Sequence, residues 1–152
     1  VLTFGSLLAE VPHTRPVSVF GAGADDEVSL DLGLLPSHYE GPTGITGVLQ
    51  VMCRDAGMST AGLWAAVPTY VPSSPSPKAA LALVRHATRI LDVADHVDLS
   101  ELEAATALYE REVTELVEDD EETQQYVDLL EQRYDEEGVS LFDDGSNLID
   151  EV

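Results

Sequence analysis

The feature that most constrains the fold is the uninterrupted apolar run Ala61–Val67. A strand with one face in water alternates apolar and polar residues, whereas a run that is apolar throughout is typical of a parallel sheet covered on both faces. Two other apolar runs, Val1–Leu8 and Val17–Phe20, predict further strands, and we expect the first to be central in the sheet. The sequence therefore predicts a sheet with helices on both sides.

Helical patterns separate these strands. Ile45–Ala56 has one apolar stripe at spacings of three and four, which predicts a helix that ends at Gly57 and packs tightly against the sheet; the stripe comprises Ile45, Val48, Leu49 and Met52. Ser76-Pro77 is a typical helix start and predicts a helix over Lys78–Leu91. Asp25–Leu32 is expected to form a short helix.

The alternation of strands and helices predicts an α/β sandwich with a largely parallel sheet. Three strands are too few for a complete sheet, and Val1 already lies in one of them. We therefore expect the chain to be the C-terminal part of a longer protein.

The character of the chain changes at residue 98. Residues 1–97 form the α/β part, 98–137 two amphipathic helices, and 138–152 an acidic tail that we expect to be poorly ordered. Each helix has one narrow apolar stripe, which must pack on its partner helix, on the α/β core or on another subunit. This oligomer or docking stripe consists of Leu102, Tyr109, Val113, Leu116, Val127, Leu130 and Tyr134.

The composition excludes several functions. The 29 acidic and 7 basic residues give a net charge of −22, which repels nucleic acids and anionic membrane surfaces. Cys53 is the only cysteine, so no internal disulfide forms, and no stretch resembles a membrane span or a secretion signal. A reducing cytoplasm is the expected compartment.

The glycine-rich loops do not match phosphate-binding motifs. Gly41–Gly47 lacks the lysine of a P-loop, and Gly21-Ala22-Gly23 lacks the third glycine of a dinucleotide fingerprint. The four histidines have no metal-ligand spacing, and no set of residues matches a known reaction class. The sequence therefore predicts no cofactor, no metal and no catalytic residues.

A candidate ligand or interaction cleft lies at the loop mouths. His13 and Arg15 stand between prolines at the end of a strand, where α/β sheets place ligands. Other residues at loop mouths complete the candidate set, which is His13, Arg15, Tyr39, Glu40, Thr43, Gly44 and Tyr70. The alternative for His13 and Arg15 is a loop held in place by hydrogen bonds.

Four stretches resemble the actinobacterial branch of the proteasome assembly chaperone family: "FGSLLAEVPHTRP", "YEGPTGITGVL", "LWAAVPTYV" and "SPKAALALV". The resemblance runs from Val1 to about Glu137. It implies a three-layer α/β/α core similar to the nucleoside phosphorylase fold, a helical C-terminal extension and a further N-terminal part. Some bacterial members are labelled ligases of the ATP-grasp type, which no residue set in this sequence supports.

Two functions follow as hypotheses. The favoured one is a non-enzymatic, cytoplasmic, homo-oligomeric protein that binds other proteins, as an assembly chaperone does. The alternative is a nucleoside-type or phosphate-type small-molecule binder, or an enzyme, that uses a cleft like that of the nucleoside phosphorylases.

Overall fold

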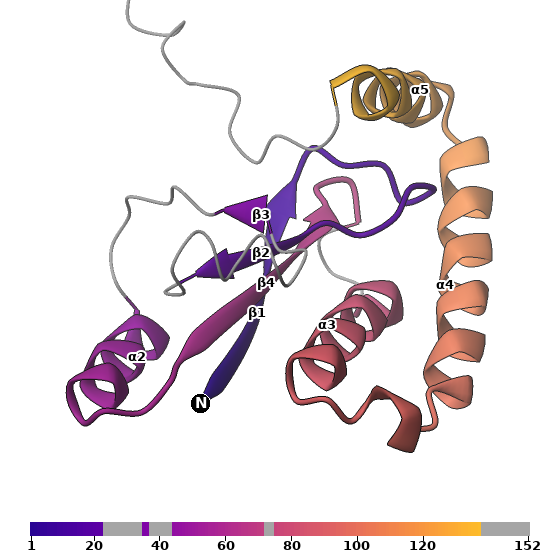
Figure 1. Ribbon diagram of the computed structural model, residues 1–152. Coiled ribbons are helices and arrows are strands. Elements are labelled where there is room, and N and C mark those ends of the chain that lie inside the picture. The colour runs from indigo at the N-terminus through magenta and orange to yellow at the C-terminus, as the bar shows by residue number, and fades with distance from the viewer. Residues whose placement is uncertain (23–34, 37–43, 72–74, 138–152) are drawn as a thin grey trace, which may run out of the picture.

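The structure is a computed structural model that describes residues 1–22, 35–36, 44–71 and 75–137 (Figure 1). It is an α/β fold with a small mixed sheet and flanking helices. The strands are β1 (Leu2–Ala9), β2 (Val19–Ala22), β3 (Leu35–Pro36) and β4 (Ala61–Pro68). The helices are α2 (Ile45–Asp55), α3 (Pro77–Ile90), α4 (Ser100–Glu118) and α5 (Glu121–Glu137), with a short 3₁₀ turn at Ala94–His96. The predicted helix at Asp25–Leu32 and the tail 138–152 lie outside the described residues.

The sheet has the order β1-β4-β2-β3 and is mixed, not largely parallel as the sequence predicts. β1 is parallel to β4 and β2 is parallel to β3, but β2 runs antiparallel to β4. The chain passes from β1 to β2 through the short, helix-free connection 10–18, and so short a connection reverses the strand direction because a parallel return needs a longer crossover. Among the described strands β1 is at the edge, so the expectation of a central position is wrong for this part of the chain.

β4 is the central strand, and its predicted burial on both faces is confirmed. Leu63 and Ala65 on one face are fully buried, and Ala66 on the opposite face is 2% exposed. The neighbouring Trp64 ring crosses over Gly5 of β1, where a Cβ atom would lie 2.5 Å from the ring. Gly5 is therefore required by this close approach and not by a turn.

α3 covers one face of the sheet, and its predicted start is confirmed. Ser76 caps the helix by accepting a hydrogen bond from the Ala79 amide, with Pro77 in the first turn. Val19 and Leu63 of the sheet pack against Ala87 of this helix. These contacts form the core of the α/β part.

α2 is attached to the other face of the sheet, and its predicted packing is wrong. Its bounds and its end at Gly57, which has a φ of 77°, agree with the prediction. The predicted core stripe, however, is 44% to 82% exposed: Ile45, Val48, Leu49 and Met52. The helix instead turns Gln50 and Cys53 inward, and the Gln50 side chain donates a 2.7 Å hydrogen bond to Thr3 Oγ1 of β1.

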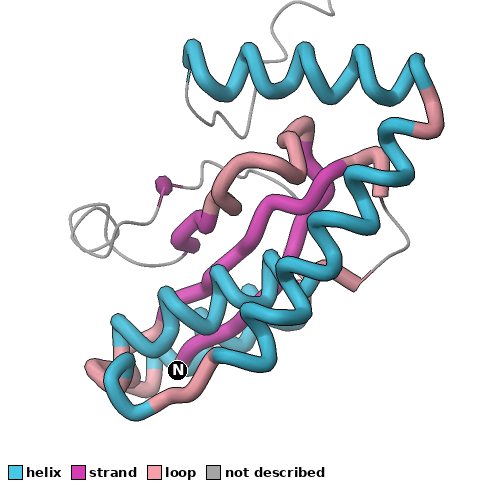
Figure 2. The backbone as a smooth tube through the Cα atoms, turned by 90° about the vertical axis from the view of Figure 1, so that its right-hand side faces the viewer, coloured by secondary structure: helices cyan, strands magenta, loops and turns pink. Residues whose placement is uncertain are grey.

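α4 runs beside α3, and α5 then turns across the loop that follows β1 (Figure 2). The predicted break between the two helices is confirmed, because α4 ends at Glu118 and α5 begins at Glu121. Asp120 caps the second helix by accepting hydrogen bonds from the amide and hydroxyl of Thr123. These bonds lower the pKa of the Asp120 carboxyl.

Candidate functional site

Loop 10–18 meets helices α4 and α5 in one cluster of polar side chains, which we call the polar junction. It comprises His13, Thr14, Arg15, Tyr70, Lys78, Glu110, Thr114, Glu131 and Asp135. The members come from loop 10–18, from the segment after β4, and from α3, α4 and α5. Three residues of the predicted cleft, His13, Arg15 and Tyr70, are therefore brought together.

His13 is at the centre of the polar junction and is only 3% exposed. Its Nε2 lies 3.0 Å from Thr114 Oγ1, whose own hydrogen is donated to the Glu110 carbonyl, so Nε2 is the donor. Its Nδ1 lies 2.8 Å from the Tyr70 hydroxyl, which also accepts the His13 backbone N–H at 2.7 Å. Nδ1 is therefore an acceptor, and the ring is the neutral Nε2–H tautomer.

This arrangement disfavours a charged His13. Burial lowers the pKa of the imidazole, and the nearby Lys78 ammonium lowers it further, while Glu131 and Glu110 oppose the shift. A proton on Nδ1 would also displace the hydrogen bond from Tyr70. His13 thus acts as a neutral connector between Tyr70 and α4.

Tyr70 and Lys78 complete the buried part of the junction. The Tyr70 ring makes edge-to-face contacts with His13 at 5.9 Å and with Tyr126 at 6.2 Å, and burial raises the pKa of its hydroxyl. The Lys78 ammonium donates to the His13 carbonyl and forms a 2.6 Å ion pair with Glu110. The only lysine of the chain thus connects α3, loop 10–18 and α4.

Arg15 ties loop 10–18 to α5. Its guanidinium makes two hydrogen bonds to Asp135, of 2.9 and 2.7 Å, and a longer contact of 3.5 Å to Glu131. The hydrogen bond with Asp135 raises the pKa of Arg15 and lowers that of the Asp135 carboxyl. Thr14 also donates to Glu131, and Arg133 pairs with Glu10 at 2.9 Å. The bidentate geometry fixes the direction in which α5 crosses the loop.

The polar junction leaves almost no room for a ligand. The cavity beside loop 10–18 measures about 10 Å³, and its lining includes His13, Arg15 and Lys78. That volume is at the lower limit for a single water molecule. The junction as described joins segments of the chain and contains no ligand-sized space.

Of the other four residues of the predicted cleft, the structure describes only Gly44, which is not part of the polar junction. Gly44 precedes α2 on the other part of the molecule, with an extended backbone. Tyr39, Glu40 and Thr43 lie outside the described residues. A ligand or interaction cleft at the seven positions therefore stays a prediction.

Most of the predicted stripe packs inside the chain. Tyr109, Val113 and Val127 are buried in one cluster with Val117, against which Tyr70 and Val71 pack. Leu130 is 1% exposed, while Leu102 and Tyr134 are partly buried. Leu116 differs, because 65% of it is exposed. Leu116 is thus the stripe residue most open to another subunit.

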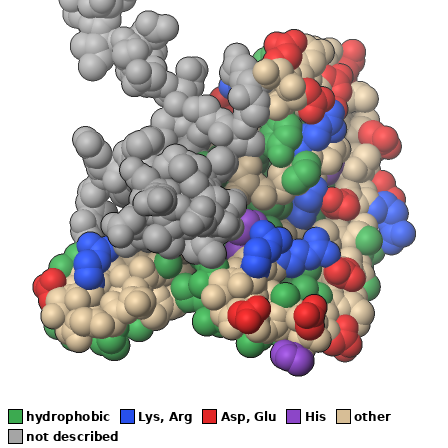
Figure 3. Space-filling view, viewed as in Figure 1, with side chains coloured by type: hydrophobic (Ala, Val, Ile, Leu, Met, Phe, Trp, Pro, Cys, Tyr) green, Lys and Arg blue, Asp and Glu red, His purple; other side chains and the backbone are tan. Residues whose placement is uncertain are grey.

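Within the described ranges, no group of three or more His, Cys, Asp or Glu side chains could hold a metal ion. None of the described helices is long and apolar enough to cross a membrane. Acidic side chains recur over α4 and α5 (Figure 3).

The small mixed sheet, its flanking helices and the C-terminal helix pair place this protein in the class of α/β folds with a helical extension. The chain belongs to the PAC2 family, whose model matches residues 1–117. This membership confirms the resemblance to the proteasome assembly chaperones.

Solved structures agree with this assignment. The chain is 46% identical to a Mycobacterium tuberculosis proteasome-assembly chaperone homologue, with a TM-score of 0.71 over 84% of this chain and 53% of that chain. It is 41% identical to a PAC2 family protein of Streptomyces avermitilis, with a TM-score of 0.70 over 84% of this chain and 52% of that one. An archaeal homologue from Pyrococcus furiosus is 21% identical, with a TM-score of 0.58 over 89% and 54% of the two chains, and shares the fold alone. No curated protein sequence matches. The chain spans about half the length of the solved structures it matches.

Proposed function

We propose that this chain is part of a non-enzymatic, assembly-chaperone-like protein that binds subunits of a proteasome during their assembly. The observation that carries the proposal is family membership together with 46% identity to a proteasome-assembly chaperone homologue. The geometry of the polar junction supports the non-enzymatic part. His13, Arg15 and Tyr70 hold loop 10–18 to α4 and α5, which is a structural task.

The proposal includes homo-oligomerisation and a cytoplasmic location. Exposed apolar side chains on the outer surfaces of α4 and α5 suit contact with another subunit; they are Leu108, Leu116 and Leu129. The buried free thiol of Cys53 suits a reducing compartment. The chain is further proposed to be the C-terminal half of a longer protein with a core like that of the nucleoside phosphorylases.

The test of the assembly role uses the full-length protein and separately purified proteasome α and β subunits of the same organism. We expect the protein to comigrate with subunits or with partly assembled particles on size exclusion, to accelerate formation of the complete particle, and to be absent from that particle. An assembly rate that is unchanged at about ten-fold molar excess, with no comigration at micromolar concentration, would refute the role.

Homo-oligomerisation is tested by light scattering on the same full-length protein. Leu116→Glu is expected to lower the molar mass, because it places a charge in the proposed subunit contact. Ile45→Glu on α2, whose side chain is 82% exposed, is the matched control and should leave the mass unchanged. A wild-type mass equal to that of one chain would rule out self-association.

A further inference from the structure

The break between α4 and α5 contains no helix-breaking residue. No glycine or proline occurs from Ser100 to Glu137. Asp119 has helical backbone angles, with a φ of −75° and a ψ of −12°, and its amide still bonds to the Glu115 carbonyl four residues earlier. The Gln124 amide bonds to the Asp120 carbonyl in the same four-residue pattern. The chain therefore leaves the helical path within a single turn that starts at Asp120.

The side chain of Asp120 holds this break. Its carboxylate accepts hydrogen bonds from the amide and hydroxyl of Thr123, and so takes the place of a backbone carbonyl in the helical ladder. An opposite effect comes from the end of α4, where Glu118 faces the partial negative charge of a helix C-terminus and the last turn has no basic residue. One continuous helix over 100–137, about 57 Å long, would remove that helix end. Opposing effects of similar size therefore act on the segment Glu118–Glu122, which we call the hinge.

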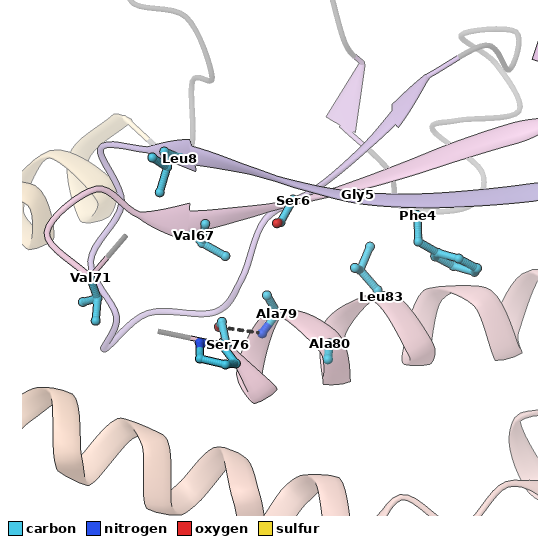
Figure 4. A pocket seen from close by; sticks show the side chains of 11 residues that line it. Phe4, Gly5, Ser6, Leu8, Val67, Val71, Ser76, Ala79, Ala80 and Leu83 are labelled. Atoms are coloured by element: carbon cyan, nitrogen blue, oxygen red, sulfur yellow. Dashed lines mark hydrogen bonds between the residues drawn. The ribbon is translucent and has the colours of Figure 1, made fainter. Parts of the chain in front are cut away.

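In the described part of the chain, α5 is held by its side chains and belongs to no strand ladder. Val127 packs in one cluster with Val113 and Val117 of α4, and Tyr70 and Val71 of the segment after β4 pack against this cluster. Val71 also lines the groove of about 510 Å³ between β1 and α3 (Figure 4). α5 can therefore leave its place without breaking the sheet.

The polar contacts of α5 are equally separable. Asp135 and Glu131 bind Arg15, and Arg133 pairs with Glu10. Each of these contacts joins a group on α5 to a group on loop 10–18, so α5 of another copy supplies the same partners at the same spacing. The surface under α5 therefore fits α5 of a second copy as well as its own.

We infer that two copies of this protein exchange α5: the hinge straightens in both, and α5 of each copy occupies the place of α5 in the other. The polar junction is then shared, because Glu131 and Asp135 reach it from the partner copy. Exchange keeps the contacts of α5 and brings the two hinges together, beside which Leu116 is 65% exposed. The inference rests on the proposed homo-oligomerisation, for which it names the contact, and is independent of the assembly role.

Paired charge reversals in the full-length protein test the exchange. Arg15→Asp and Asp135→Arg each place like charges at the polar junction, both in a closed chain and in a pair of identical chains. A pair made of one variant of each kind restores both attractions if α5 is exchanged. After an equal mixture is refolded from urea, native mass spectrometry should find at least about three-fold more mixed pairs than identical pairs. Random pairing gives equal numbers.

A hinge variant measures the same equilibrium independently. Asp120→Ala removes the cap that holds the break, and should lower the dissociation constant of the pair about ten-fold, because each pair contains two hinges. Asp119→Ala is the matched control, since it removes the same charge at the adjacent position without removing the cap. It should change the dissociation constant by less than about three-fold. Analytical ultracentrifugation of the full-length protein measures both.

Three results would overturn the inference. Equal numbers of mixed and identical pairs, in a protein whose mass is that of two or more copies, would exclude the exchange and leave self-association in place. A dissociation constant for Asp120→Ala no lower than that for Asp119→Ala would also exclude it. A mass of one chain for the wild type and for the mixture would exclude the exchange together with the proposed homo-oligomerisation.

Discussion

The polar junction and the side of the molecule formed by β1 and α2 differ in how far their side chains are buried. In the junction, buried His13 bonds to the partly buried Tyr70, and the adjoining apolar cluster of α4 and α5 around Val113 and Val127 is buried within the chain. Around β1 and α2, Phe4, Leu8 and the stripe of α2 remain exposed. Burying apolar surface contributes roughly 25 cal/mol per Å² to folding. The exposed side chains of β1 and α2 therefore stabilise the fold less than the buried ones beside the polar junction.

The difference separates the part of the described chain that is closely packed from the part whose apolar side chains are exposed. Helices α4 and α5 carry 13 of the 29 acidic residues, and ion pairs such as Arg15 with Asp135 connect them to the rest of the chain. The side formed by β1 and α2 has fewer charged residues, but many of its apolar side chains are exposed. Mutations should therefore cost more stability at the junction than at the exposed positions of β1 and α2.

The largest effect is expected from truncating Leu130, a fully buried side chain in the middle of α5. Leu130→Ala removes a side chain that is 1% exposed and should lower the free energy of unfolding by about 2–5 kcal/mol. Leu129→Ala, at the adjacent position with 49% exposure, is the matched control and should change it by about 0.5 kcal/mol or less. Urea denaturation measures both, and equal losses would mean that α5 is not packed as described.

A smaller loss is expected when the hydroxyl of Tyr70 is removed. Tyr70→Phe leaves the His13 amide and Nδ1 without their partner in a buried place, which should cost about 1–3 kcal/mol. Tyr134→Phe is the control, because that hydroxyl makes an exposed 3.3 Å hydrogen bond to the Pro16 carbonyl. A Tyr70→Phe protein as stable as the control would contradict the described role of Tyr70.

The pH dependence of stability should carry the signature of His13. Its pKa is lowered from 6.5 in the folded state, so below pH 6.5 the unfolded chain takes up a proton that the folded chain does not. The His13 contribution is thus complete above pH 6.5 and is lost as the pH falls toward the lowered pKa.

Denaturation midpoints at about pH 7.5 and about pH 5.5 measure this effect. The drop between them should be larger for the wild type than for His13→Gln, which retains the other three histidines. A drop of the same size in both proteins would show that His13 titrates normally.

The smallest effect is expected at the exposed ion pair. Arg15→Met removes the bonds to Asp135 and Glu131 but leaves the buried part of the junction intact. Solvent weakens the attraction between exposed charges, so the denaturation midpoint should fall less than for Tyr70→Phe. The difference in midpoint from the wild type should shrink at about 1 M salt, because salt screens the attraction further. A larger fall than that of Tyr70→Phe would place the main anchor of α5 at Arg15.

Local patterns were sufficient to predict several elements of the fold. The apolar run of β4, the Ser76-Pro77 start of α3 and the stripes of α4 and α5 each depend on residues within one element. The direction of β2, the edge position of β1 and the exposed stripe of α2 depend on how distant segments pair. The apolar stripe of α2 has the pattern of a core stripe, but the spacing within one helix does not determine whether another segment packs on it.

The polar junction shows the same limit. The sequence singled out His13, Arg15 and Tyr70 but not their partners on the helices, Thr114, Glu131 and Asp135. His13 and Thr114 are 101 positions apart, and Arg15 and Asp135 are 120 apart, so no local spacing connects them. One signal was available: Glu131 and Asp135 are four residues apart, which places two carboxylates on the same face of a helix.

Hydrogen exchange over the whole 152-residue chain tests the central contrast most directly. The account predicts that the most protected amides lie in β4 and in the buried turns of α4 and α5 around Val113 and Leu130, while α2 exchanges through small, local openings. Protection in α4 and α5 no greater than in α2 would contradict it, because the polar junction would then fail to anchor the helix pair to the sheet.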